Sequence, residues 1–202
     1  MSSEAISLTI YLKKSEFPPD KDIIKKIIND ELSYAKSITT VLDTNDVDVI
    51  INSRRYGLNN EFKLENARPK QIEKFFDKKW IYEGIKSIDF QFKSNDKGQI
   101  DFKLFPIYGE EIDDGLHDTR LDDFEILGYL SYHDGTSGSL DERFFDLGEN
   151  IIRMLPENLT KDDHLIRFKG FDEKTEIMNS SSFYKRVIDL KNEYCNNPDL
   201  RK

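Results

Sequence analysis

The sequence predicts a single α+β domain, residues 1–202, in which helices cover one face of a mainly antiparallel sheet. The chain has 202 residues and is 12% aromatic, which is enough to build one hydrophobic core. Hydrophobic residues alternate with polar ones at 88–92 and 100–104, around a loop that contains Gly98. Such a pattern predicts a β-hairpin. Other stretches carry hydrophobic residues at helical spacing, so both kinds of element are expected.

The N-terminal part of the chain is expected to form a strand followed by a helix. Hydrophobic residues alternate with polar ones from Ile6 to Leu12, which predicts a strand with one buried face. An acidic residue, Asp20 or Asp22, can cap a helix that runs to about Lys36. The hydrophobic stripe of this helix should face the sheet.

A second short strand is predicted at 47–51, and a second helix between Pro69 and Gly84. Residues 52–60, which follow the strand, are predicted to form a loop. This loop contains Arg54-Arg55-Tyr56, a group that a phosphate-binding site could use. A turn with two solvated arginines is the simpler interpretation.

A third strand is expected beside the hairpin, from Phe124 to Tyr132. Side chains alternate between the two faces of a strand, so Tyr129 and Tyr132 should lie on opposite faces. An acidic insertion, residues 110–125, separates this strand from the hairpin.

The C-terminal part, residues 139–195, is expected to be mainly helical. Ser139 and Glu142 have the spacing of a capping box, and Pro156 would end the helix that they begin. Gly148 lies inside this helix and weakens it by about 1 kcal/mol relative to alanine. A close crossing with another helix or a bend would explain a glycine there.

A last helix is predicted from Ser182 to Tyr194. In the stretch before it, residues 165–168 are short enough to form either a strand or part of a helix. His164 is expected at the surface, and Cys195 is expected to be a half-buried, unreactive thiol. The residues of the last helix that should face inward are Phe183, Val187, Leu190 and Tyr194.

The net charge of −9 is concentrated in the acidic insertion. Residues 110–125 contain eight Asp or Glu residues and one arginine. A local negative field of this kind repels nucleic acid and anionic lipid, and it attracts basic proteins or cations. We therefore expect no direct nucleic-acid partner and no membrane partner.

The first interpretation of the acidic insertion is a binding surface for a basic protein. Its carboxylates would speed the encounter, and the hydrophobic residues between them would supply apolar contacts. The chain would then be a non-enzymatic cytosolic protein-binding module of the inhibitor or immunity type, with a nuclease toxin or other nucleic-acid-binding protein as its partner. A solvated insertion that only aids solubility is the alternative. The residues expected at the interface are Asp113, Asp114, Asp118, Asp122, Asp123, Phe124 and Tyr129.

The alternative function is a divalent-metal-dependent hydrolase. Asp113, Asp114, His117 and Asp118 offer oxygen ligands and one imidazole, and His133 could act as a base. The spacing does not fit an EF-hand, because Asp118 occupies the position that requires glycine. The sequence has no Walker loop, dinucleotide fingerprint, HExxH or G-x-S-x-G motif. We therefore expect a protein that is not an enzyme and binds no cofactor.

A third hypothesis is a ligand-binding domain that uses the aromatic-rich face of the sheet. A closed, filled core on that face would argue against it.

The sequence favours a cytoplasmic location. It contains no run of about 18 apolar residues and no basic head followed by an apolar stretch. The single cysteine cannot form an internal disulfide, which fits a reducing compartment.

Overall fold

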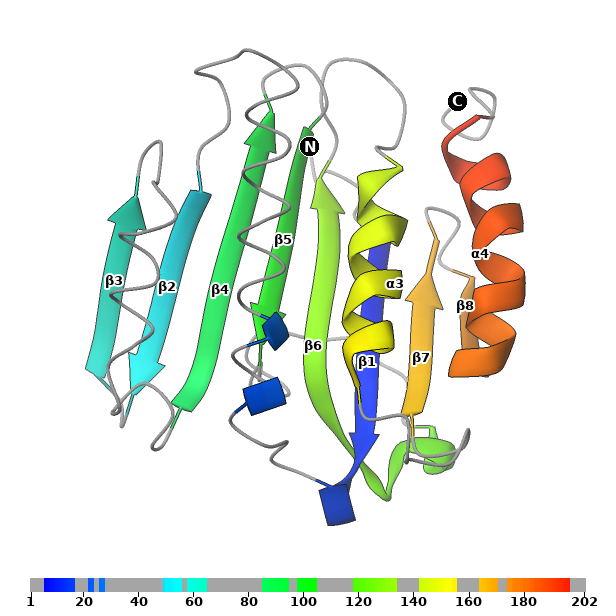
Figure 1. The fold of residues 1–202 in the computed structure, drawn as a ribbon, viewed down its shortest axis with the longest axis horizontal. Helices are drawn as coiled ribbons and strands as arrows, with labels where there is room; N and C mark the ends of the chain where they lie inside the picture. The colour runs from blue at the N-terminus through cyan, green and yellow to red at the C-terminus, as the bar shows by residue number, and fades with distance from the viewer. Residues whose placement is uncertain are drawn as a thin grey trace.

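The computed structural model describes residues 6–16, 22–23, 26–27, 49–55, 58–64, 85–94, 98–104, 118–133, 142–155, 164–170 and 174–196. Figure 1 shows that their strands form one sheet and that helices α3 (Arg143–Met154) and α4 (Ser180–Tyr194) lie on one face of it.

The described strands pair in the order β3-β2-β4-β5-β6-β1-β7-β8, and each pair is antiparallel (Figure 1). The prediction of an α+β fold with a mainly antiparallel sheet is therefore confirmed. The strands are β1 (Ile6–Lys13), β2 (Val49–Arg55), β3 (Leu58–Leu64), β4 (Ile85–Ser94), β5 (Gly98–Leu104), β6 (Phe124–His133), β7 (His164–Lys169) and β8 (Thr175–Asn179).

The predicted hairpin and the third predicted strand both occur in the structure. β4 and β5 form the hairpin, and Phe90 pairs with Phe102. The third predicted strand is β6, which pairs with β5 and brings Leu130 opposite Phe102. Tyr132 of this strand is fully buried and Tyr129 is half-buried, as the alternation of faces requires.

The N-terminal strand lies inside the sheet, between β6 and β7. β1 therefore has a hydrogen-bonded neighbour on each side. The register with β6 shifts between Ile10 and Tyr11, where β6 carries Leu127 as an extra residue. Leu127 is buried in the core, so the bulge adds one more hydrophobic side chain to the interior.

The predicted loop at 52–60 is wrong, because most of it is a second hairpin. β2 continues to Arg55, and β3 begins at Leu58. Arg54 belongs to β2 and pairs with Asn59 on one side and Ser87 on the other. An interior strand gains backbone hydrogen bonds on both sides, and these outweigh the weak strand propensity of Asn, Ser and Arg.

The stretch at 165–168 is a strand, not a helix. It lies in β7, which forms a hairpin with β8 at the end of the sheet. The prediction that His164 lies at the surface is wrong, since only 7% of it is exposed. His164 pairs with Leu12 of β1, and its Nδ1 atom lies 3.2 Å from the hydroxyl oxygen of Ser180.

The two C-terminal helices are α3 (Arg143–Met154) and α4 (Ser180–Tyr194). Glu142 stands at the N-cap of α3 but makes no capping hydrogen bond with its side chain, and Ser139 lies outside the described residues. α4 begins two residues before its predicted start, because the side chain of Asn179 caps it. The Oδ1 atom of Asn179 accepts the backbone N–H of Ser182 at 2.9 Å.

Both helices pack on the same face of the sheet and share one hydrophobic core with it (Figure 1). The ring of Phe168 in β7 lies between those of Phe145 in α3 and Tyr194 in α4. The predicted inward residues of α4 are all buried. The side chains of β1, β6 and β7 that belong to this core are buried, which argues against the ligand-binding hypothesis for that part of the face.

Gly148 marks a close approach, as the sequence predicted, but to a strand and not to another helix. A Cβ atom at this position would lie 2.3 Å from Cδ2 of Leu8 in β1. Gly148 therefore lets α3 lie directly on β1.

Several predictions fall on residues outside the described ranges. Of the first predicted helix, only Asp22–Ile23 and Lys26–Ile27 are described; they are helical, and Ile27 is fully buried. The second predicted helix, 69–84, is not among the described residues. The first half of the acidic insertion, 110–117, is also outside them.

Candidate partner-binding surface

Four predicted interface residues lie in the described turn between Asp118 and Phe124, and Tyr129 follows in β6. We call residues 118–125 the acidic turn. The other predicted residues, Asp113, Asp114 and His117, lie outside the described part of the chain.

The acidic turn begins with a short 3-10 helix, η3 (Thr119–Leu121), that Asp118 caps. The Oδ1 atom of Asp118 accepts the backbone N–H of Arg120 at 2.9 Å, and its carbonyl accepts the N–H of Leu121 at 3.0 Å. Aspartate is favoured at this position because its short carboxylate reaches the unpaired N–H groups of the first turn.

Arg120 also neutralises the charge of Asp118. Its Nε atom lies 3.0 Å from Oδ1 and 3.1 Å from Oδ2, and its Nη2 atom lies 2.6 Å from Oδ2. The side-chain hydrogen bonds of Arg120, and then its backbone N–H, lower the pKa of Asp118 to about 2. The same pair raises the pKa of Arg120. Asp118 therefore helps to fold the turn, and its two oxygens are already engaged.

Lys14 anchors the acidic turn to the end of β1. Its backbone N–H donates to the carbonyl of Asp123 at 2.9 Å, and its Nζ atom donates to the carbonyl of Asp122 at 2.6 Å. The backbone of the turn is thus tied down, while the side chains of Asp122, Asp123 and Glu125 remain exposed.

The two predicted aromatic anchors meet in one apolar cluster on the sheet face opposite the helices. Tyr11 and Ile126 are its buried members. Phe124 and Tyr129 pack against them and are half-buried, as are Leu121 and Leu165. The structure therefore places exposed carboxylates next to half-buried aromatic rings, a combination common at protein interfaces.

The same face carries polar residues that the sequence analysis did not single out. Arg167 of β7 pairs with Thr9 of β1, which in turn pairs with Tyr129 of β6. Arg167 is only 4% exposed, and its charge contributes to the low pKa of Asp118. The alternation of Arg167 with the buried Ile166 and Phe168 is the sequence signal that could have placed it on this face.

The described ranges contain no cluster of side chains that could bind a metal ion. Of the four ligands predicted for a divalent cation, only Asp118 is described, and its carboxylate is held by Arg120. Within that part of the chain no three His, Cys, Asp or Glu side chains gather as a cation would require. No observation favours the hydrolase hypothesis over the binding hypothesis.

None of the helices described in the structure combines the length and the apolar character that a membrane span requires. Comparisons with protein-family models, with curated proteins and with solved structures find no match to this chain.

Proposed function

We propose that the chain is a non-enzymatic, cytoplasmic protein-binding module of the inhibitor or immunity type, which docks the acidic turn on a basic protein. The observation that carries the proposal is the anchored, exposed set of carboxylates at Asp122, Asp123 and Glu125, beside the half-buried ring of Phe124. Asp118 and Arg120 neutralise each other, so Asp122, Asp123 and Glu125 are the acids of the turn that supply negative charge, beside the ammonium group of Lys14.

The carboxylates, the aromatic rings and the anchored backbone of this surface would each contribute to binding in a different way. Exposed carboxylates raise the encounter rate with a positive partner through long-range attraction, which salt screens. Half-buried aromatic rings give the docked complex apolar contacts that charge alone lacks. A backbone held by Lys14 loses little entropy on binding, because the turn is already ordered.

A basic nuclease toxin or another nucleic-acid-binding protein is the partner class that this chemistry fits. Such proteins present clustered Lys and Arg side chains that normally bind phosphates. A set of carboxylates can occupy those side chains in place of the nucleic acid, which would inhibit the partner. This step rests on charge complementarity.

Affinity capture with matched baits tests the proposal. The full chain and an Asp123→Asn/Glu125→Gln variant are immobilised and exposed to extract from the source cell at low salt. A Glu142→Gln/Asp189→Asn bait loses the same charge at two exposed sites, the N-cap of α3 and the surface of α4, and serves as the control. We expect a basic protein to be retained by the native and control baits, lost from the variant bait, and eluted by salt. Equal retention of every basic protein by all three baits would refute the proposal.

A further inference from the structure

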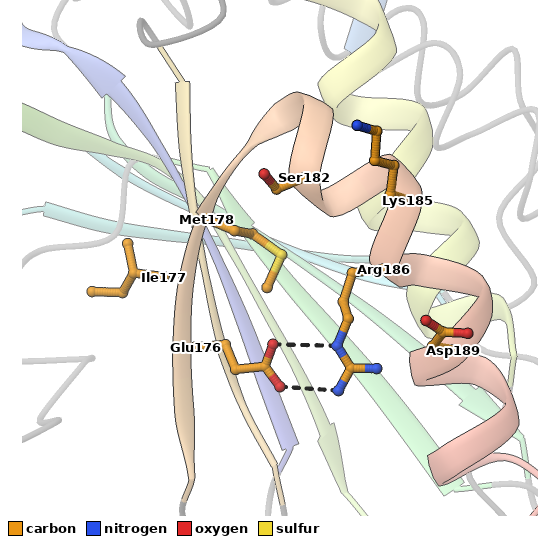
Figure 2. Close-up of a pocket in the computed structure, with 7 residues that line it drawn as sticks. All are labelled: Glu176, Ile177, Met178, Ser182, Lys185, Arg186 and Asp189. Atoms are coloured by element: carbon orange, nitrogen blue, oxygen red, sulfur yellow. Dashed lines mark hydrogen bonds and ion pairs between the residues drawn. The ribbon is translucent and has the colours of Figure 1, made fainter.

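A groove of about 340 Å³ lies between β8 and α4 at the end of the sheet (Figure 2). β8 is the terminal strand on this side among the strands that the structure describes. A terminal strand can offer unpaired backbone groups to a strand of another molecule, which is a route to association and aggregation. In Figure 2, Glu176 and Met178 of β8 point toward α4, whereas Ile177 points to the other side.

A row of hydrophobic side chains crosses the helix-covered face of the sheet and ends on a charge. The last two members of this row are Phe168 in β7, which is 1% exposed, and Glu176 in β8, whose side chain is 43% exposed. The neighbouring row on this face ends on a hydrophobic residue instead. Its last two members are Ile166 and Met178, and Met178 packs against the core. The full row, in sheet order, is Phe102, Leu130, Leu8, Phe168 and Glu176.

Arg186 of α4 reaches across the groove to hold this terminal carboxylate (Figure 2). Its Nε atom donates to Oε2 of Glu176 at 3.3 Å, and its Nη2 atom donates to Oε1 at 3.1 Å. Nη2 also donates to Glu193 at 3.0 Å. The side-chain hydrogen bonds with Glu176 are the main cause of the raised pKa of Arg186, so Arg186 keeps its positive charge at any physiological pH.

We propose that this bridge between Glu176, Arg186 and Glu193 blocks strand pairing at β8 and so prevents a second copy of the chain from extending the sheet. A strand added to β8 would set a side chain beside Glu176 on the same face and would remove water from the ion pair. Natural edge strands are commonly protected by short length and by an inward-pointing charge. β8 has five residues, and Glu176 is such a charge.

Without the bridge, the same edge would favour association. Ile177 and Met178 are half-buried and lie on opposite faces of β8, so a second β8 strand would gain apolar contacts on both faces. The bridge thus adds an unfavourable contribution to association, which is the burial of a charged pair beside the incoming strand.

Sedimentation velocity and light scattering of the purified full chain, over a wide concentration range, test the proposal. The Glu176→Thr/Arg186→Met variant removes one negative and one positive charge. We expect its dimerisation constant to exceed that of the native chain by about tenfold or more. The control is Glu149→Gln/Arg153→Met, which removes another surface ion pair, on α3, at the same net charge. It should behave as the native chain does.

A third variant locates the association. Ile177→Lys, added to the Glu176→Thr/Arg186→Met background, places a charge on the other face of the edge and should restore the monomer. If the double variant does not fold by circular dichroism, Glu176→Gln alone should raise the dimerisation constant by a smaller factor. The proposal is overturned if the folded variants remain monomeric, if the native chain associates as strongly as they do, or if Ile177→Lys has no effect.

Discussion

Arg120 binds both carboxylate oxygens of Asp118, and the shortest contact, between Nη2 and Oδ2, is 2.6 Å. The same carboxylate accepts the backbone N–H of Arg120. One aspartate therefore caps a turn and forms half of a bidentate ion pair. This arrangement fixes the backbone that presents Asp122 and Asp123 at the surface.

Replacing Asp118 should alter stability in a specific range of pH. The pKa of Asp118 is about 2 in the folded chain and 3.8 in an unperturbed carboxyl group. Its stabilising effect is therefore complete above about pH 4 and is lost as the pH falls toward 2, because the unfolded chain takes up the proton first. We expect Asp118→Asn to lower the melting temperature at neutral pH and to remove this part of the acid sensitivity.

Thermal unfolding followed by circular dichroism between pH 2 and pH 7 measures this effect. Asp123→Asn is the matched control, because Asp123 is an exposed acid of the same turn. The control should retain the native loss of stability below pH 4. Parallel pH profiles for the native chain and Asp118→Asn would contradict the role assigned to the pair.

Adding one methyl group at Gly148 should destabilise the fold. Alanine is about 1 kcal/mol better than glycine in a helix, but its Cβ atom would lie 2.3 Å from Cδ2 of the fully buried Leu8. Overpacking of a filled core costs about 1–3 kcal/mol. We expect Gly148→Ala to lower the free energy of unfolding in urea, in spite of its helix propensity.

A double-mutant cycle identifies the cause. In a Leu8→Ala background the space beside position 148 is open, so Gly148→Ala should become neutral or stabilising. An equal loss in both backgrounds would show that the contact with Leu8 is not the reason for the glycine.

The stack of rings between the two helices and the sheet should dominate core stability. Phe168 is 1% exposed, and its ring centroid lies 5.7 Å from that of Phe145 and 5.2 Å from that of Tyr194. We expect Phe168→Ala to cost about 3–5 kcal/mol of unfolding free energy in urea. Ile188→Ala, at a position that is 65% exposed, should change it by less than about 0.5 kcal/mol. Similar losses for both variants would contradict this core.

The strands at Ile6 to Leu12 and Phe124 to Tyr132 could be predicted from the sequence, because a one-residue shift in a strand would move its hydrophobic side chains to the opposite face. The burial of the other face of β1 was not predicted, since Thr9 and Tyr11 are also buried. β2 and β3 could not be predicted in full, since Asn52 and Ser53 favour a turn by local propensity. Pairing with strands that are distant in sequence decided their conformation.

The sequence predicted which residues form the candidate site, but it did not predict their contacts. The sequence located the acids of the 118–125 turn and the aromatic residues beside them. It did not show that Arg120 neutralises Asp118 or that Lys14 anchors the turn. Lys14 is 108 residues from Asp122 in the chain, and local patterns carry no information about such a contact. His164 was misplaced for a related reason, because its burial depends on pairing with β1.

The most direct test of the proposed docking surface is the association rate with the captured basic protein, measured by stopped flow as a function of salt. For the native chain and the Glu142→Gln/Asp189→Asn control, we expect fast association that slows steeply as salt rises. For Asp123→Asn/Glu125→Gln, we expect association about tenfold slower at low salt and a flatter dependence on salt. Equal rates and equal salt dependence for all three proteins would contradict the account.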